Sequence, residues 1–151
     1  MRKLMFMFGL LAFASPMFAA DPFAGTWKLN AAQSKYTASA LPKDETIVIE
    51  EQGDNLQTTI TGAFADGSPI SLKYTSPAKG GAGQIQEGPY DAVSVKRINA
   101  NTREITYSKG GKIMRVSHGS VSPDGKTLRV RAKGTDLQGK PVAGVMVLDR
   151  Q

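Results

Sequence analysis

The 151-residue chain contains no cysteine and only one histidine, His118. The absence of cysteine excludes disulfide bonds, thiolate metal sites, a cysteine nucleophile and a lipidated N-terminal cysteine. A single histidine excludes histidine-rich zinc sites and leaves little room for a histidine-based catalytic triad. Because no motif for a metal or another cofactor is present, none is expected. The length fits one domain with a core of its own.

Long apolar runs are also scarce, and the one that is present lies at the N-terminus. Two positive charges precede an apolar run at positions 4–14, and the small residues Ala19 and Ala20 follow. The run is shorter than the roughly 20 residues that span a bilayer, and the layout is typical of a secretory signal peptide. We therefore expect a signal peptide at 1–20, cleaved after Ala19 or Ala20, and a mature domain at 21–151 that is periplasmic or secreted. An uncleaved N-terminal anchor is the alternative.

Charge is unevenly spread along the mature chain. Residues 21–90 carry five lysines and eight acidic residues, whereas residues 91–151 carry twelve lysines and arginines and five acidic residues. A basic face can attract anions, acidic membranes or nucleic acid. The basic residues here alternate with apolar ones and do not cluster with aromatic ones. We therefore expect a solvated face, no nucleic-acid partner and no stable membrane insertion.

Hydrophobic alternation with a period of two dominates the mature chain, and no stretch shows a sustained helical period. Turn residues separate the alternating segments, which is typical of an all-β barrel or sandwich. We expect a single antiparallel up-and-down β-barrel of eight to ten strands, with a β-sandwich as the alternative. Ten strands would let the last strand close antiparallel against the first. The ten candidate strands are Gly25–Asn30, Glu45–Gln52, Asn55–Phe64, Pro69–Thr75, Gln84–Glu87, Asp91–Ile98, Arg103–Lys109, Lys112–Val121, Thr127–Gly134 and Pro141–Arg150.

Three turns predict the register of the strands in the second half of the chain. A two-residue loop at 110–111 and three-residue loops at 99–101 and 123–125 fix which residues pair. All three loops agree on one face, and a shift of one residue would invert that face. The inner face should contain Val93, Val95, Ile105, Tyr107, Met114, Val116, Leu128, Val130 and Ala132, and the outer face Arg115, Arg129, Arg131 and Lys133.

The same register brings three basic side chains to the inner face at one end of neighbouring strands. These are Arg97, Arg103 and His118, with Tyr107 further along the face. Two arginines and a histidine at the end of an apolar cavity can hold a carboxylate or a phosphate, since arginine offers a planar pair of donors. The alternative is that they lie at the rim, where water solvates them. These four residues are the candidate ligand-binding set.

A motif at the start of the mature chain resembles a known superfamily. Phe23–Leu29, which reads Phe-Ala-Gly-Thr-Trp-Lys-Leu, is similar to the opening strand of lipocalins (calycins) and intracellular fatty-acid-binding proteins, which share a Gly-x-Trp element. The resemblance implies an antiparallel barrel around a ligand cavity, with Trp27 at its floor and Arg150 as a cover. This start and the Gly-Lys turns at 124–126 and 138–140 also resemble small secreted bacterial lipocalin-like proteins.

The last strand departs from the pattern of fatty-acid-binding proteins. Those proteins carry Arg-x-Tyr there to hold the lipid carboxylate, whereas this chain has Met146-Val147-Leu148. We therefore do not expect carboxylate capture by that route. The last strand is also apolar on both faces. One face must then be covered by residues 31–43 or offered to a partner, such as a second copy of the chain in a homodimer.

Three functions remain open at this point. The first, which we favour, is non-catalytic binding of a small, partly apolar ligand, either anionic or uncharged, in the cell envelope or outside the cell, because a barrel of this size can enclose one such molecule. The second is a structural or protein-interaction barrel whose own side chains fill its core. The third is an isomerase or hydrolase on the same fold, which the absence of an acid–base constellation disfavours.

Overall fold

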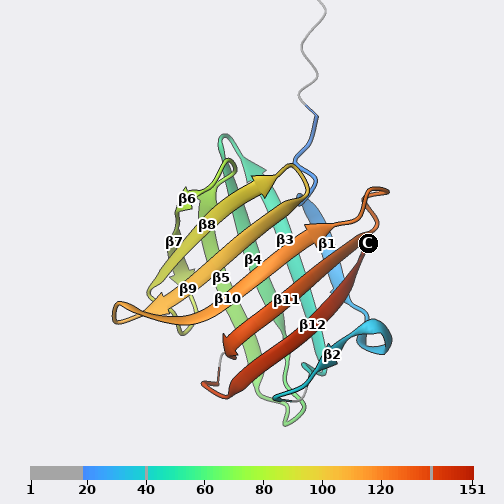
Figure 1. Ribbon diagram of the computed structural model, residues 1–151, viewed down its shortest axis with the longest axis vertical. Helices are drawn as coiled ribbons and strands as arrows, with labels where there is room; N and C mark the ends of the chain where they lie inside the picture. The colour runs from blue at the N-terminus through green and yellow to red at the C-terminus, as the bar shows by residue number, and fades with distance from the viewer. Residues whose placement is uncertain (1–18, 40, 137) are drawn as a thin grey trace, which may run out of the picture.

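In the computed structural model, which describes residues 19–39, 41–136 and 138–151, the protein is all-β. Most of the expected signal peptide lies outside the described residues. Figure 1 shows the strands curving around a common axis, with one short 3-10 helix, η1 (Ala31–Gln33). The strands are β1 (Gly25–Leu29), β2 (Lys35–Tyr36), β3 (Asp44–Gln52), β4 (Asn55–Ala63), β5 (Pro69–Pro77), β6 (Gly81–Ala82), β7 (Gln84–Glu87), β8 (Ala92–Asn99), β9 (Thr102–Lys109), β10 (Lys112–Val121), β11 (Thr127–Thr135) and β12 (Pro141–Arg150).

The sheet forms a nearly closed antiparallel barrel and not a sandwich of two sheets. All ten segments predicted as strands are present, and the two-residue strands β2 and β6 take the count above the expected eight to ten. Leaving aside the short strands β2 and β6, each strand pairs with the next strand along the chain at every place except one, the seam. The last strand, β12, pairs antiparallel with the first, β1. The seam lies instead between β7 and β8. There a backbone hydrogen bond from Gly83 N to Val93 O (2.8 Å) links the β6–β7 connection to β8.

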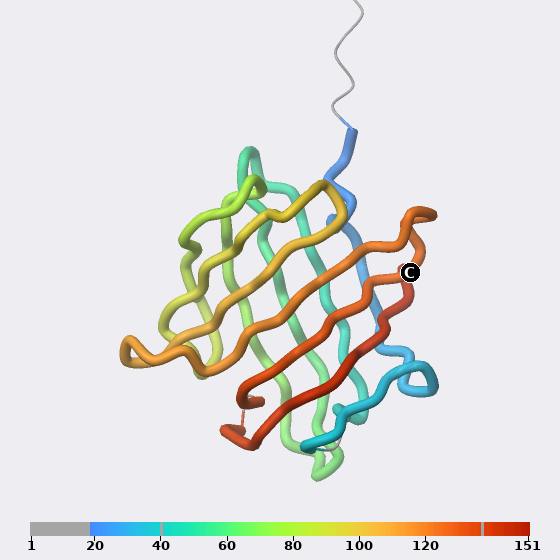
Figure 2. Tube along the Cα trace, viewed as in Figure 1, coloured from blue at the N-terminus to red at the C-terminus, as the bar shows by residue number. Residues whose placement is uncertain are grey.

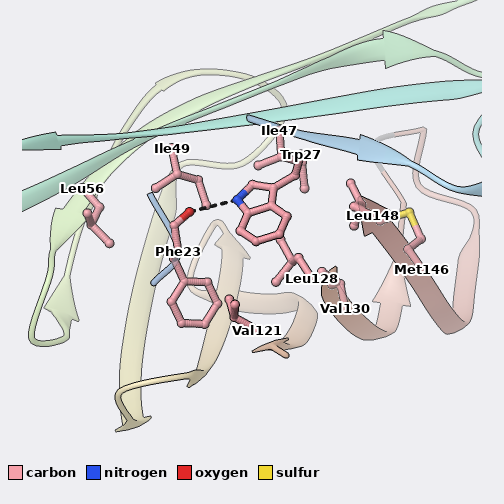
Figure 3. Close-up of a cluster of buried hydrophobic side chains, with 10 residues drawn as sticks. All are labelled: Phe23, Trp27, Ile47, Ile49, Leu56, Val121, Leu128, Val130, Met146 and Leu148. Atoms are coloured by element: carbon pink, nitrogen blue, oxygen red, sulfur yellow. Dashed lines mark hydrogen bonds between the residues drawn. The ribbon is translucent and has the colours of Figure 1, made fainter. Parts of the chain in front are cut away.

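The segment before β1 closes one end of the barrel. Phe23 and Trp27 are fully buried there, and the Trp27 Nε1–H donates a hydrogen bond of 2.9 Å to the Phe23 carbonyl oxygen (Figure 3). The Arg150 guanidinium carbon lies 4.1 Å from the centre of the Trp27 ring, and Arg150 Nη1 donates to the Ala24 carbonyl oxygen. Gly25 has a φ of 135°, and a side chain there would collide with the Arg150 guanidinium. The structure thus places Trp27 and Arg150 where the Gly-x-Trp resemblance implied. The core around them contains Ile47, Ile49, Leu56, Val121, Leu128, Val130, Met146 and Leu148.

Residues of the β1–β2 connection hydrogen-bond along the edge of β12. β1 and β2 pair with the same edge of β12, and η1 separates them. The Asn30 N–H donates to the Val147 carbonyl oxygen (2.8 Å), and the Val147 N–H donates to Ser34 Oγ (2.9 Å). Val147 is only 4% exposed. At this position the chain itself covers the second apolar face of the last strand.

A β-bulge changes the register between β9 and β10. Lys109 pairs with Lys112, as predicted for the two-residue loop, but the pairing shifts at Met114. Beyond the bulge, Arg115 and not Met114 lies opposite Tyr107. A bulge adds one unpaired residue to one strand, so every later side chain of β10 changes face.

The turn between β10 and β11 is also longer than predicted. It contains four residues, 123–126, because the Ser122 N–H donates to the Thr127 carbonyl oxygen (2.9 Å) and Val121 pairs with Leu128. The bulge and the longer turn each shift β10 by one residue relative to a neighbour. Its inner face beyond the bulge therefore contains Arg115, Ser117, Gly119 and Val121, whereas Val116, His118 and Ser120 point outward.

The predicted inner face of the other strands is confirmed. The bulge between β9 and β10 and the longer turn between β10 and β11 shift the register by one residue each and cancel. The side chains predicted to point inward from β9 and β11 therefore do so. Their inward positions and those of β8 are buried: Val93, Val95, Ile105, Tyr107, Leu128, Val130 and Ala132. Three predictions for β10 are wrong, namely that Val116 and His118 point inward and that Arg115 points outward.

Candidate ligand-binding cavity

A cavity lies inside the barrel between its closed end and the loops at the opposite end. The volume that the centres of water-sized molecules can occupy inside it is about 60 Å³. All the space between the lining atoms, including solvent at the open end, is about 830 Å³. Ile47, Ile60, Leu72 and Ile105 form part of its apolar wall. The smaller volume is well below the roughly 300–1,000 Å³ that is typical of ligand pockets, so a bound molecule must be slender and must also use the space toward the open end.

The two ends of the cavity differ in how they are built. Phe23 lines the closed end, which is the end that the N-terminal segment reaches first (Figure 2). The opposite end is lined by the half-buried Tyr36, Phe64 and Asp136, near the loops that follow β4 and β11. A second, more open pocket shares Phe64 and Asp136 with the cavity. We call this end the mouth.

Arg103 is the central polar group at the closed end. It points inward from β9, is only 4% exposed, and its guanidinium carbon lies 4.3 Å from the centre of the Phe23 ring. Opposite it on β10 is Gly119, which has no side chain to fill the space in front of Arg103. Arg103 Nε and Nη1 are buried and have no hydrogen-bond partner among the described residues. A buried cation without partners is costly, so this group needs an anion or acceptor from outside the chain.

Two buried hydroxyl groups share this lack of partners. Thr58 on β4 and Ser76 on β5 are each 1% exposed, and neither hydroxyl has a partner in the part of the chain that the structure describes. Thr58 lines the same cavity as Arg103. Ser76 pairs with Leu56, which packs in the same core cluster as Phe23. Hydroxyl donors and a guanidinium left free in one half of a barrel are suited to a carboxylate or a similar oxyanion.

Tyrosine side chains line the middle of the cavity. The Tyr107 hydroxyl donates to the Tyr74 hydroxyl oxygen (3.4 Å), and the two rings meet edge to face. Tyr90 stacks on Tyr107 with ring centres 5.0 Å apart. Burial raises the pKa of Tyr107 well above the ordinary value, so this hydroxyl stays neutral and keeps its proton. The middle of the cavity is thus uncharged.

A second polar group of residues lies at the mouth. We call Glu45, Arg115, Tyr36 and Tyr90 the mouth cluster; all four line the cavity. Arg115 Nε donates to Ser117 Oγ (3.1 Å). Burial raises the pKa of the Glu45 carboxyl to about 7, and the nearby Arg115 guanidinium opposes that shift. Glu45 is therefore near the midpoint of its titration at neutral pH.

The tyrosines of the mouth cluster are hydrogen-bond donors. Burial raises the pKa of Tyr36 and of Tyr90, and Arg115, which lies beside both hydroxyls, opposes the shift. Tyr36 reaches the mouth because β2 pairs with β12 at Gly144, where any side chain would collide with residues 35 and 36. A positive φ of 155° at Gly144 and this close approach both require glycine.

Arg97 does not line the cavity, although the sequence predicted that it would bind ligand. It pairs with Arg103 across β8 and β9, as expected. Its guanidinium instead forms an ion pair with Asp21 Oδ2 at 2.8 Å and donates to the Ala78 carbonyl oxygen. Arg97 thus ties the N-terminal segment to β8, and its guanidinium carbon lies 5.2 Å from the centre of the Phe23 ring.

His118 is the second predicted site residue that lies elsewhere. It points outward because of the bulge in β10, and its Nε2 is 3.4 Å from Glu104 Oε2 on the outer surface. Of the four predicted binding residues, the structure therefore brings only Arg103 and Tyr107 together in the cavity.

Sequence reasoning missed Glu45 and Arg115. Glu45 precedes the buried Ile47 and Ile49 on β3 in steps of two residues, so all three side chains lie on the same face of the strand. Strict alternation along β3 could therefore have predicted that Glu45 points into the barrel. Arg115 could be found only by recognising the bulge at Met114, for which the sequence has no local marker such as glycine.

Comparisons with known proteins leave the barrel to be interpreted from its own geometry. A scan against protein-family models, a search of curated proteins and a search of solved structures each found no match to the chain. Among the described residues, no helix has the length and apolar character needed to cross a membrane. No group of three or more histidine, aspartate or glutamate side chains in the same part of the chain is arranged to hold a metal ion.

Proposed function

We propose that this protein is a lipocalin-like binding protein that holds one small, partly apolar anion inside its barrel without transforming it. The anionic group would lie at the closed end against Arg103, and the apolar part would follow the cavity wall toward the mouth. The observation that carries the proposal is the buried guanidinium of Arg103, whose Nε and Nη1 lack partners. Charge-assisted hydrogen bonds from arginine to a carboxylate are among the strongest that a protein can offer.

Binding can be tested with decanoate, a slender monocarboxylate, by isothermal titration calorimetry and thermal melting. Ligand that binds only the folded protein raises its melting temperature by mass action. We expect decanoate to bind the wild-type protein and to lose most of its affinity in Arg103→Met, which keeps the apolar volume but removes the charge. Arg131→Met is the matched control, because Arg131 is exposed on the outer face of β11. Equal affinity in both variants, or no binding to wild type, contradicts the proposal.

A filled barrel without ligand is the second candidate function. The observation in its favour is that Tyr74, Tyr90 and Tyr107 pack against one another inside the barrel. Such a protein would be a structural or protein-interaction module. Native mass spectrometry of protein purified from its own host separates the two, since a co-purifying small molecule supports binding and a ligand-free dimer supports the module.

We also propose that the protein acts in the cell envelope or outside the cell, as the apolar segment at 4–14 suggests. Asp21, the first residue after the proposed cleavage site, already forms part of the closed end through its ion pair with Arg97. N-terminal sequencing of exported protein should then find Asp21, or Ala20, as the first residue. An intact Met1 would contradict export by cleavage.

A further inference from the structure

We propose that the ligand has two ends, a single anionic group for Arg103 and an uncharged hydrogen-bonding group, such as a hydroxyl, for the mouth cluster. This inference rests on the proposed function and specifies its ligand class. The ligand would be a slender monoanion with a polar far end, and neither a plain fatty acid nor a diacid would match the cavity as well.

The first argument is the number of charges in the cavity. Two guanidinium groups, those of Arg103 and Arg115, line it, together with two carboxyl groups at the mouth, those of the buried Glu45 and the half-buried Asp136. Arg115 has partners within the protein, since Glu45 and Ser117 lie beside it. Arg103 has none among the described residues at two of its nitrogens. One negative charge, placed at the closed end, therefore completes the pairing of the buried charges.

The second argument concerns what the mouth cluster can accept. Glu45 is 7% exposed as a whole residue, lines the cavity and accepts no hydrogen bond from any residue that the structure describes. A carboxylate arriving beside Glu45 would meet a like charge in a poorly hydrated place, which is unfavourable. A hydroxyl group can donate to Glu45 and accept from Tyr36, so it satisfies the cluster without adding charge. The Tyr90 hydroxyl already donates to the Thr135 carbonyl oxygen (3.4 Å) and would have to turn from it to reach a ligand.

The third argument is the spacing between the two ends. Arg103 pairs with Gly119, and Arg115 lies four residues from Gly119 along β10. Four residues of strand correspond to about 13 Å. The wall between the two ends is contributed by apolar side chains and by Tyr107, including Ile105 and Leu72. A medium-chain ligand with polar groups at both ends has the length and polarity pattern of this cavity.

The test compares three ligands of equal chain length by calorimetry on the folded mature protein at pH 8. They are decanoate, 10-hydroxydecanoate and decanedioate. We expect 10-hydroxydecanoate to bind about tenfold more tightly than decanoate, because it adds a hydrogen bond at the mouth. Decanedioate should bind more weakly than decanoate, because its second carboxylate meets Glu45. Equal affinity for decanoate and 10-hydroxydecanoate, or strongest binding of decanedioate, overturns the inference.

Variants of the mouth cluster identify where the second end binds. Tyr36→Phe and Tyr90→Phe remove one hydroxyl group each and keep the ring. We expect the pair of substitutions together to abolish the preference for 10-hydroxydecanoate over decanoate. Glu45→Gln should remove the penalty on decanedioate. A preference that survives the double tyrosine substitution places the hydroxyl group elsewhere and overturns the inference.

The two proposals fail in different ways. If none of the three ligands binds, the proposed function fails and this inference fails with it. If decanoate binds through Arg103 but the far-end hydroxyl adds nothing, the proposed function stands and only the two-ended ligand class is overturned.

Discussion

The guanidinium carbon of Arg103 lies 4.3 Å from the centre of the Phe23 ring, and two of the guanidinium nitrogens are buried without partners. The Phe23 ring offsets part of the cost of this buried charge through a cation–π contact. Nothing in the described part of the chain supplies the missing acceptor. In the ligand-free protein, Arg103 is therefore a source of instability that an anion would relieve.

Replacing Arg103 should consequently stabilise the ligand-free protein. Arg103→Met removes the unpaired charge and keeps an apolar side chain of similar length, so we expect the free energy of unfolding to rise by about 1–2 kcal/mol. Urea denaturation of protein freed of ligand measures this change. Arg131→Met should change the same quantity by less than about 0.5 kcal/mol, since Arg131 is exposed. A loss of stability in Arg103→Met would mean that the charge is already paired.

Trp27 should dominate the stability of the closed end. It is fully buried beneath Arg150, and it is the sole tryptophan, so fluorescence reports on it alone. We expect blue-shifted emission that iodide quenches poorly, and a loss of about 3–5 kcal/mol in Trp27→Ala, the range for emptying a large aromatic site. Trp27→Phe should lose less, because a ring still fills the space. Red-shifted, freely quenched emission would contradict a closed end built on this residue.

Glu45 should make stability depend on pH in an unusual direction. Its folded pKa is about 7, above its ordinary value of 4.5, so between these values the folded state binds more protons than the unfolded state. The free energy of unfolding should then fall as pH rises from about 4.5 to 7, by up to about 3 kcal/mol from this group. Glu45→Gln removes the fall. Compared with wild type, the variant should be more stable at pH 8 and similar near pH 4.5, and a difference that does not change with pH would contradict this assignment.

The inverted face of β10 can be tested because the chain contains no cysteine. Single cysteines introduced by Val116→Cys and His118→Cys should react rapidly with a thiol reagent in the folded protein. Ser117→Cys should be protected, since Ser117 is 3% exposed and points into the barrel. The opposite pattern, with position 117 reactive and 116 and 118 protected, would restore the register without the bulge.

Much of the fold could be predicted because turns and alternation are local features. Glycine, asparagine and aspartate mark the hairpins, and a period of two separates the faces of each strand. The Gly-x-Trp element was also readable, since Gly25 is needed for the close approach of Arg150 above Trp27. These signals predict the nearly closed meander and the floor of the barrel. They did not give β2, whose two residues pair with β12 only after the chain has passed through η1.

The site was less predictable because it depends on side-chain partners far apart in the sequence. The bulge at Met114 and the four-residue turn after β10 cancel for the neighbouring strands, so three turns agreed on a face that was wrong for β10. Arg97 and Arg103 pair as predicted, yet Asp21, 76 residues earlier in the chain, draws Arg97 away from the cavity. Alternation gives the face of a residue, but it does not reveal which partner holds its charge.

The most direct test of the central claim is an NMR measurement of nuclear Overhauser effects between isotopically labelled protein and bound, unlabelled decanoate. If Arg103 holds the carboxylate, the methylene group next to it should give contacts to the Phe23 ring, and the far end of the chain should give contacts near Tyr36 and Phe64. Contacts from the carboxylate end to Tyr36 and Phe64, or contacts only to the outer face around Val116 and His118, would contradict an anion site at the closed end of the barrel.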